Sequence, residues 1–224
     1  EQTIALLDVD NRTAEASQDV EGAYNTFWWD WGTELNEDLR TSLIIDPADG
    51  RLPAITATAM ARLDEQNRLR TPPVRDLFSY GANSTTFRAP GPESLGLSER
   101  CLVGFNAGPP FTPNLYNNNV QIVQNRDTVV IMTEMIHDAR IVPLDGRAHI
   151  DDTIRQWSGD SRGYFDGDTL VVETRNFNDL TQSFGVYGSS LNKVLTERFT
   201  RVDVYTVNYE FTIEDPETFT RPFS

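Results

Sequence analysis

The chain has 224 residues, of which 34 are acidic and 19 are basic, so its formal net charge is −15. Such an acidic surface repels phosphate groups, which argues against nucleic acid as a partner, and the chain has no apolar run of about 20 residues with which to insert into a membrane. The single cysteine, Cys101, rules out a disulfide within the chain and a cysteine-based zinc site, and two histidines argue against a multi-histidine metal centre.

The first half of the chain is predicted to hold an extended arm, one strand and long loops. Residues 1–20 are polar apart from one short apolar patch and are expected to form the arm. Five aromatic residues lie within positions 24–31, which is typical of a strand with one side in the core. Residues 71–119 are rich in Pro, Gly, Asn and Ser, which predicts long surface loops that are either binding loops or poorly ordered.

One turn and one helix are predicted between these segments. The apolar residues 43–45 are closed by a turn at 46–50, where proline presets φ and glycine tolerates positive φ. Residues 57–69 are the best helix candidate, because Thr56 or Thr58 can cap the start and two prolines follow the end.

The second half of the chain changes to a hairpin pattern. The turn signals are residues 125–127, the pair Asp166-Gly167, and residues 202–204. Tyr205 to Ile213 alternate between apolar and polar residues, so one face of this last strand is expected to be buried. The predicted strands are 120–123, 128–132, 139–142, 162–165, 168–174, 195–201 and 205–213.

We therefore expect a mainly β protein. Residues 1–224 are predicted to form a single domain, with the arm at 1–20, a strand, helix and loops at 21–119, and an antiparallel β meander at 120–224. Because open sheet edges invite aggregation, such a meander is expected to close into a lipocalin-like barrel or to fold into a sandwich, and the barrel is favoured.

Several phrases resemble those of a family of exported proteins from Gram-negative bacteria for which no activity is established. The phrases that carry the resemblance include RTSLIIDPADGR at 40–51, EMIHDAR at 134–140, WSGDSRG at 157–163 and GDTLVVET at 167–174. The resemblance implies a secreted or periplasmic bacterial protein. The start at Glu1 fits a mature chain from which a signal peptide has been removed.

Residues 134–140 form the candidate catalytic segment, with Glu134, His137 and Arg140 as the residues proposed to act. A histidine beside a carboxylate can supply a general acid–base pair, and Arg140 could hold a substrate carboxylate or an oxyanion. The alternative is a charged strand end whose side chains pair with one another and with turn amides.

The candidate ligand-binding residues are two aromatic and two polar side chains. Trp29 and Trp157 could line a pocket for a hydrophobic or sugar-like ligand, although aromatic residues in strands also serve as core. Asn118 belongs to a run of asparagines that could form either a polar binding loop or a turn. Arg162 is the second candidate anion stabiliser. We expect no metal site and no cofactor.

Three functional hypotheses stay open. The first is a secreted or periplasmic protein that binds a small, partly hydrophobic ligand. The second is a cofactor-free lyase, isomerase or hydrolase that uses His137 and Glu134. The third is a structural protein whose arm at 1–20 adds a strand to a neighbour's sheet, which would make it a homo-oligomer.

Overall fold

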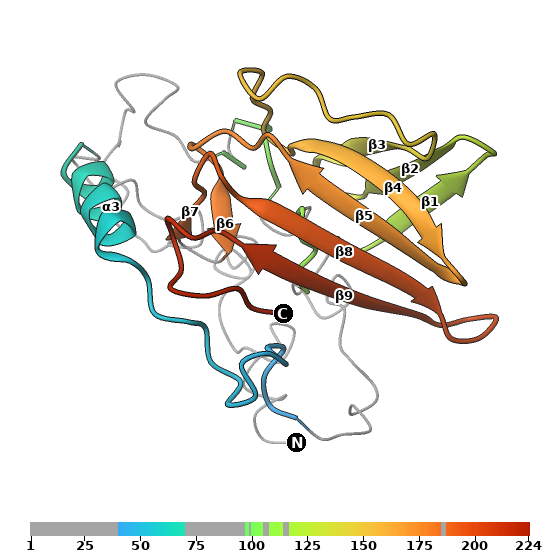
Figure 1. Cartoon of the computed structure of the whole chain (residues 1–224), viewed down its shortest axis with the longest axis horizontal. Helices are drawn as coiled ribbons and strands as arrows, with labels where there is room; N and C mark the ends of the chain where they lie inside the picture. The colour runs from blue at the N-terminus through green and yellow to red at the C-terminus, as the bar shows by residue number, and fades with distance from the viewer. Residues whose placement is uncertain (1–39, 70–96, 99, 105–107, 114–116, 185–186) are drawn as a thin grey trace, which may run out of the picture.

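The structure, a computed structural model, describes residues 40–69, 97–98, 100–104, 108–113, 117–184 and 187–224. The predicted arm at 1–20, the aromatic strand at 24–31 and most of the predicted loops at 71–119 lie outside these residues. The described parts of 71–119 contain neither helix nor strand, as predicted. Two antiparallel sheets and one helix make up most of the regular structure (Figure 1).

The helix α3 spans Ala57–Leu69, which confirms the predicted range. Thr56 caps it, because the backbone N–H of Ala59 donates to Thr56 Oγ1 at 3.1 Å. Thr56 Oγ1 in turn donates to the carbonyl of Glu217 at 2.6 Å, so the cap also fixes the helix to the C-terminal segment. No helix in the described ranges is long and apolar enough to cross a membrane.

The first sheet has three antiparallel strands in the order β1-β2-β3. They span Val120–Gln124, Thr128–Thr133 and Ala139–Pro143. The predicted turn between β1 and β2 is confirmed, since Asn125 Oδ1 accepts the backbone N–H groups of Asp127 and Thr128, both at 2.9 Å. A short 3₁₀ helix, η4 (Met135–His137), connects β2 to β3.

The second sheet has four antiparallel strands in the order β4-β5-β8-β9. They span Asp160–Asp166, Thr169–Arg175, Val194–Arg201 and Val207–Glu214. A small hairpin of β6 (Gln182–Phe184) and β7 (Tyr187–Gly188) interrupts the chain between β5 and β8, and the sequence did not predict it.

Two details of the predicted hairpins are wrong. Asp166 pairs with Thr169, so the tight turn consists of Gly167 and Asp168 and not of the predicted Asp166 and Gly167. The last strand begins at Val207 instead of Tyr205, whose side chain is 95% exposed at the turn. Burial of the alternating face increases along β9: Val207 is exposed, Tyr209 and Phe211 are partly buried, and Ile213 is fully buried.

The two sheets share a hydrophobic core. Inward-facing side chains of β2 and β3 pack against those of β5 and β8; the buried members of this cluster are Val129, Ile131, Val142, Leu170, Val172 and Phe199. The strands β3 and β4 approach each other closely, but they are not hydrogen-bonded neighbours. The mainly β prediction is confirmed, and no closed barrel is detected among the described residues.

A second core cluster lies at one end of the four-stranded sheet. Residues 215–224 return along β9, where Ile213 and Phe223 exchange backbone hydrogen bonds of 2.9 and 3.2 Å. The cluster joins the segment around Ile44 to this C-terminal return; its buried members are Ile44, Phe177, Leu195, Ile213, Phe219 and Phe223. The N-terminal part of the described chain is thus anchored on the sheet by the last residues.

Candidate functional site

A buried ion pair joins the two sheets. Arg140 on β3 donates both Nη atoms to the carboxylate of Glu197 on β8, at 2.5 and 3.0 Å. The two residues are 7% and 0% exposed. Burial lowers the pKa of Arg140, but the charge of Glu197 and its hydrogen bonds outweigh burial and raise the pKa above its ordinary value. Arg140 is therefore fixed as a cation between the sheets.

Two aromatic residues extend this pair toward the surface. Tyr209 on β9 donates its hydroxyl to Glu197 Oε1 at 2.8 Å, and the same hydroxyl accepts the backbone N–H of Phe111 at 3.1 Å. The guanidinium of Arg140 lies 5.2 Å from the centre of the Phe111 ring. Burial, followed by the charge of Glu197, raises the pKa of Tyr209 well above its ordinary value. The loop that carries Phe111 is thus held on the sheets by a protonated tyrosine.

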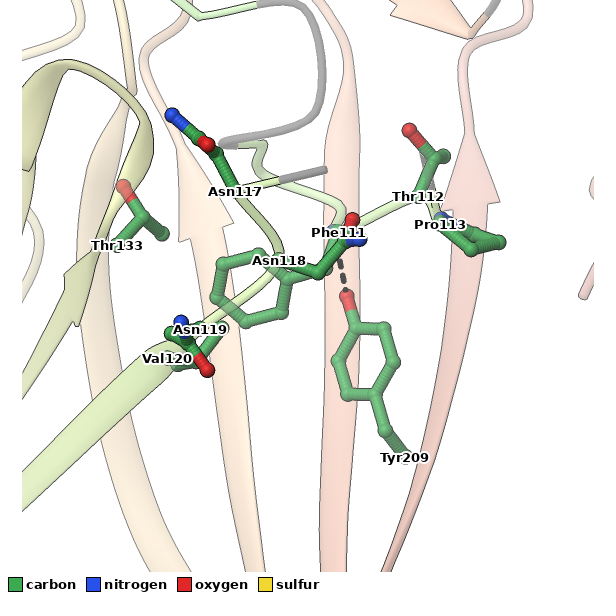
Figure 2. A pocket seen from close by; sticks show the side chains of 9 residues that line it. All are labelled: Phe111, Thr112, Pro113, Asn117, Asn118, Asn119, Val120, Thr133 and Tyr209. Carbon is green, nitrogen blue, oxygen red and sulfur yellow. Dashed lines mark hydrogen bonds between the residues drawn. The ribbon is translucent and has the colours of Figure 1, made fainter. Parts of the chain in front are cut away.

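Phe111 and Tyr209 form part of the wall of a pocket of about 210 Å³. In Figure 2 the stretch from Asn117 to Val120 runs past the Phe111 ring, with Thr133 and Tyr209 on opposite sides in the view. The wall combines apolar side chains with amides and hydroxyls; its members are Phe111, Thr112, Pro113, Asn117, Asn118, Asn119, Val120, Thr133 and Tyr209.

The asparagine stretch is tied to the connection between β2 and β3. Asn117 has a φ of 59°, a left-handed conformation that asparagine tolerates better than most residues, and it turns the chain into β1. The backbone N–H and the side-chain amide of Asn119 both donate to Glu134 Oε2, at 3.3 and 2.8 Å. Glu134 therefore braces one wall of the pocket from outside it.

The same connection has an unusual backbone. Ile136 and His137 have φ values of 62° and 47°, which are costly for side chains with a Cβ and especially for a β-branched one. The hydroxyl of Thr133, which lines the pocket, donates to the carbonyl oxygen of Met135 at 3.2 Å and so holds this turn in place. Backbone strain is therefore concentrated beside the pocket.

The structure separates the three predicted catalytic residues. Glu134 binds Asn119, Arg140 binds Glu197, and His137 is exposed on η4. Arg140 faces the core because it alternates with the exposed Ala139 and Ile141 along β3.

Among the predicted ligand-binding residues that the structure describes, only Asn118 lines the pocket. Trp157 is half-buried in the connection between β3 and β4. Arg162 pairs with Asp160 at 2.8 Å and also donates to the carbonyl of Ala148 at 3.0 Å. Trp29 lies outside the described residues.

Arg162 belongs to a second polar cluster, on the outer face of β4 and β5. His149 lies between two carboxylates, with Nδ1 2.8 Å from Asp160 Oδ2 and Nε2 3.2 Å from Glu173 Oε1. Arg175 donates to Glu173 at 2.7 Å, and this hydrogen bond is the main cause that lowers the pKa of Glu173. Each carboxylate is thus balanced by an arginine, so the cluster fastens the loop before β4 to the sheet.

A third group of charges lies in the core near the small hairpin. Lys193 is 1% exposed, and its Nζ lies 4.1 Å from the centre of the Phe177 ring. Burial lowers its pKa to about 8, although Asp215 and Glu197 act in the opposite direction. Asp215 is 2% exposed and accepts the backbone N–H of Ser190 at 3.0 Å. Neither Lys193 nor Asp215 is among the described residues of the pocket wall.

Sequence reasoning missed Phe111, Tyr209 and Thr133 as pocket residues. Tyr209 was predicted only as a core residue of the last strand, and Phe111 lay unmarked in a proline-rich loop. The available signal was that loop itself, since long loops over a β sheet often carry binding residues.

The described residues contain no group of three His, Cys, Asp or Glu side chains arranged to hold a metal ion. What the pocket offers chemically is recognition of a ligand by apolar contact together with amide and hydroxyl hydrogen bonds. The chain matches no known family model, no curated protein and no solved structure.

Proposed function

We propose that the protein binds a small, partly hydrophobic ligand in the pocket between Phe111 and the stretch Asn117–Asn119. The observation that supports this most directly is the wall itself, which combines aromatic and aliphatic surface with several amides and hydroxyls around about 210 Å³. The part of the wall formed by Phe111 and Tyr209 is well fixed. Tyr209 donates to Glu197 and holds the backbone of Phe111, and the ring of Phe111 lies against Arg140. A pocket with a fixed wall costs less entropy to fill than a mobile loop does.

The wall favours binding over acid–base catalysis. Catalysis by His137 and Glu134 would need an imidazole and a carboxylate within reach of one bound molecule. None of the nine wall residues is a histidine or an acid, and Glu134 already accepts two hydrogen bonds from Asn119.

Native mass spectrometry of the protein purified from its source tests the proposal. We expect a bound small molecule on the wild-type chain and its loss from an Asn118→Trp variant, whose indole would fill the pocket. Asn208→Trp is the matched control, because Asn208 is exposed on β9 and does not line the pocket. A wild-type protein that carries no ligand and gains none from a source extract would contradict the proposal.

We also propose that the protein is exported to the periplasm or beyond, on the basis of the family-like phrases at 40–51, 134–140 and 167–174. Fractionation of source cells by osmotic shock tests this directly. The protein should appear in the periplasmic or the medium fraction, and recovery with the cytoplasmic proteins would contradict export.

A further inference from the structure

None of the nine described residues of the pocket wall carries a charged side chain. Its polar members are asparagines, threonines and Tyr209, which stays protonated because burial and Glu197 raise its pKa. Arg140, whose guanidinium lies 5.2 Å from the centre of the Phe111 ring, already has its counter-ion in Glu197. An ionised ligand would lose water on entry without gaining an opposite charge, and the net charge of −15 adds repulsion for anions. The wall therefore favours an uncharged ligand.

The wall is rich in polar groups for its size. Five of its nine described residues carry an amide or an aliphatic hydroxyl, around a cavity of about 210 Å³. Two of these groups already donate within the protein, the amide of Asn119 to Glu134 and the hydroxyl of Thr133 to Met135, and their oxygen atoms can still accept hydrogen bonds. Asparagine amides and hydroxyl groups can each donate and accept hydrogen bonds. The wall can therefore bond the hydroxyl groups of a ligand in either direction. This volume lies below the range of about 300–1,000 Å³ that is typical of pockets for drug-sized ligands, which favours a ligand of a single ring. Such a wall suits a ring that carries several hydroxyl groups.

The rest of the wall is apolar. Phe111 presents an aromatic ring, and Val120 and Pro113 add aliphatic surface. A ligand that fits must therefore have one face of C–H groups as well as polar edges. A purely apolar ring would not use the hydrogen-bonding capacity that the amide and hydroxyl groups of the wall retain.

We infer that the ligand is a neutral sugar of a single ring, held with its C–H face toward Phe111 and its hydroxyls toward Asn118 and its neighbours. This inference rests on the proposed function of the pocket, and it specifies the class of ligand. A sugar ring combines the required size, absence of charge, apolar face and hydroxyl edges.

The test is a binding panel on the full chain, read by saturation-transfer NMR and by isothermal titration calorimetry. The panel contains glucose, galactose, mannose and N-acetylglucosamine, the charged analogues glucuronate and glucosamine, and benzyl alcohol as a neutral aromatic ring. We expect at least one neutral sugar to bind. The affinity for its charged analogue should be about tenfold lower, and Asn118→Ala should lower the affinity for the neutral sugar by about tenfold. Asn208→Ala is the matched control and should leave the affinity unchanged.

The outcomes separate this inference from the proposed function. Binding of benzyl alcohol that depends on Asn118, without binding of any sugar, would overturn the sugar class and leave the pocket proposal in place. Equal binding of a charged analogue and its neutral parent would also overturn the inference. Failure of the whole panel, together with an empty protein in native mass spectrometry, would overturn both. Circular dichroism of each variant establishes that a lost affinity is not a lost fold.

Discussion

Arg140 and Glu197 show how a residue's role follows from its surroundings and not from its type. Their ion pair is fully enclosed, while the pair of Arg198 and Asp166, 3.2 Å apart, lies on the outside of the same sheet with both side chains at least 40% exposed. Buried charges lose their water, so removing one partner leaves the other without compensation. Exposed charges are solvated either way and contribute little.

This contrast gives a prediction for the free energy of unfolding. Glu197→Gln should cost about 3–5 kcal/mol, because it leaves Arg140 as an unpaired buried cation. Arg198→Ala, the matched exposed control, should cost less than about 1 kcal/mol. Urea denaturation measures both.

A double variant checks the mechanism. Arg140→Met with Glu197→Gln removes both charges, keeps an acceptor for the hydroxyl of Tyr209, and should recover most of the stability lost in Glu197→Gln alone. Equal losses in the free energy of unfolding for Glu197→Gln and Arg198→Ala would contradict this explanation.

Lys193 predicts a specific dependence of stability on pH. Its pKa is about 8 in the folded chain and near 10.5 when exposed, so between these values the unfolded chain binds more protons at this site. The contribution of Lys193 to stability should therefore rise as pH increases from 8 to about 10, by up to about 1 kcal/mol per pH unit. Above pH 10 the raised pKa of Tyr209 acts with the opposite sign, because the folded chain then keeps a proton that the unfolded chain loses.

The measurement compares wild type with Lys193→Met by urea denaturation at pH 7.5, 8.5 and 9.5. The variant lacks the titrating amine, so the difference between the two free energies should change across this range. Parallel curves would show that Lys193 does not titrate there, whatever the absolute cost of the substitution.

At the scale of elements, the approach of β3 to β4 depends on Gly163. A Cβ at this position would lie 2.7 Å from Val142 Cγ1, closer than real side chains tolerate, and 3.0 Å from Leu144 Cδ2, which is a tight contact. Val142 is fully buried and cannot move aside easily. The absence of a side chain at 163 thus lets the two sheets meet along this edge.

Gly163→Ala should therefore destabilise the protein by about 1–3 kcal/mol, as overpacking of a core does. Combining it with Val142→Ala makes room for the new methyl group, so the double variant should cost less than the sum of the two single costs. Thermal and urea denaturation of the three variants measure this coupling. If the cost of the double variant equals the sum of the two single costs, the new methyl group does not contact Val142.

The elements also show what could be predicted from the sequence. The helix at 57–69 and the strands flanking tight turns were predicted because their signals are local: a cap, two prolines, an asparagine or a glycine at a turn. The sequence left the choice between a barrel and a sandwich open, and it did not show which strands belong to which sheet, because that depends on contacts between residues far apart, such as Arg140 and Glu197.

The side chains of the predicted catalytic segment lie in different surroundings for a related reason. Neighbouring residues were grouped because they are adjacent in the sequence, but a strand sends alternate side chains to opposite faces. Arg140 therefore enters the core while Ala139 and Ile141 face outward. Asn118 was the exception, since it lies in a loop and does reach the pocket.

At the scale of the whole molecule, the net charge of −15 acts on the compact state by self-repulsion. Raising sodium chloride from about 0.01 to 0.15 M shortens the screening length from about 30 to 8 Å. We expect the melting temperature to increase over this range, as measured by differential scanning calorimetry. Chloride is used because sulfate also strengthens apolar burial and would confuse the two effects. A falling melting temperature would contradict the prediction.

The position of Lys193 has a practical consequence. It is the only lysine in the sequence, and the folded protein encloses its side chain almost completely. Reagents that modify lysine amines should thus reach it only when this part of the core opens. The extent of modification after a short pulse, read by mass spectrometry of the peptide that contains Lys193, would then report how often the native core opens and closes in solution. The chain carries its own probe of that motion, with no label to be engineered.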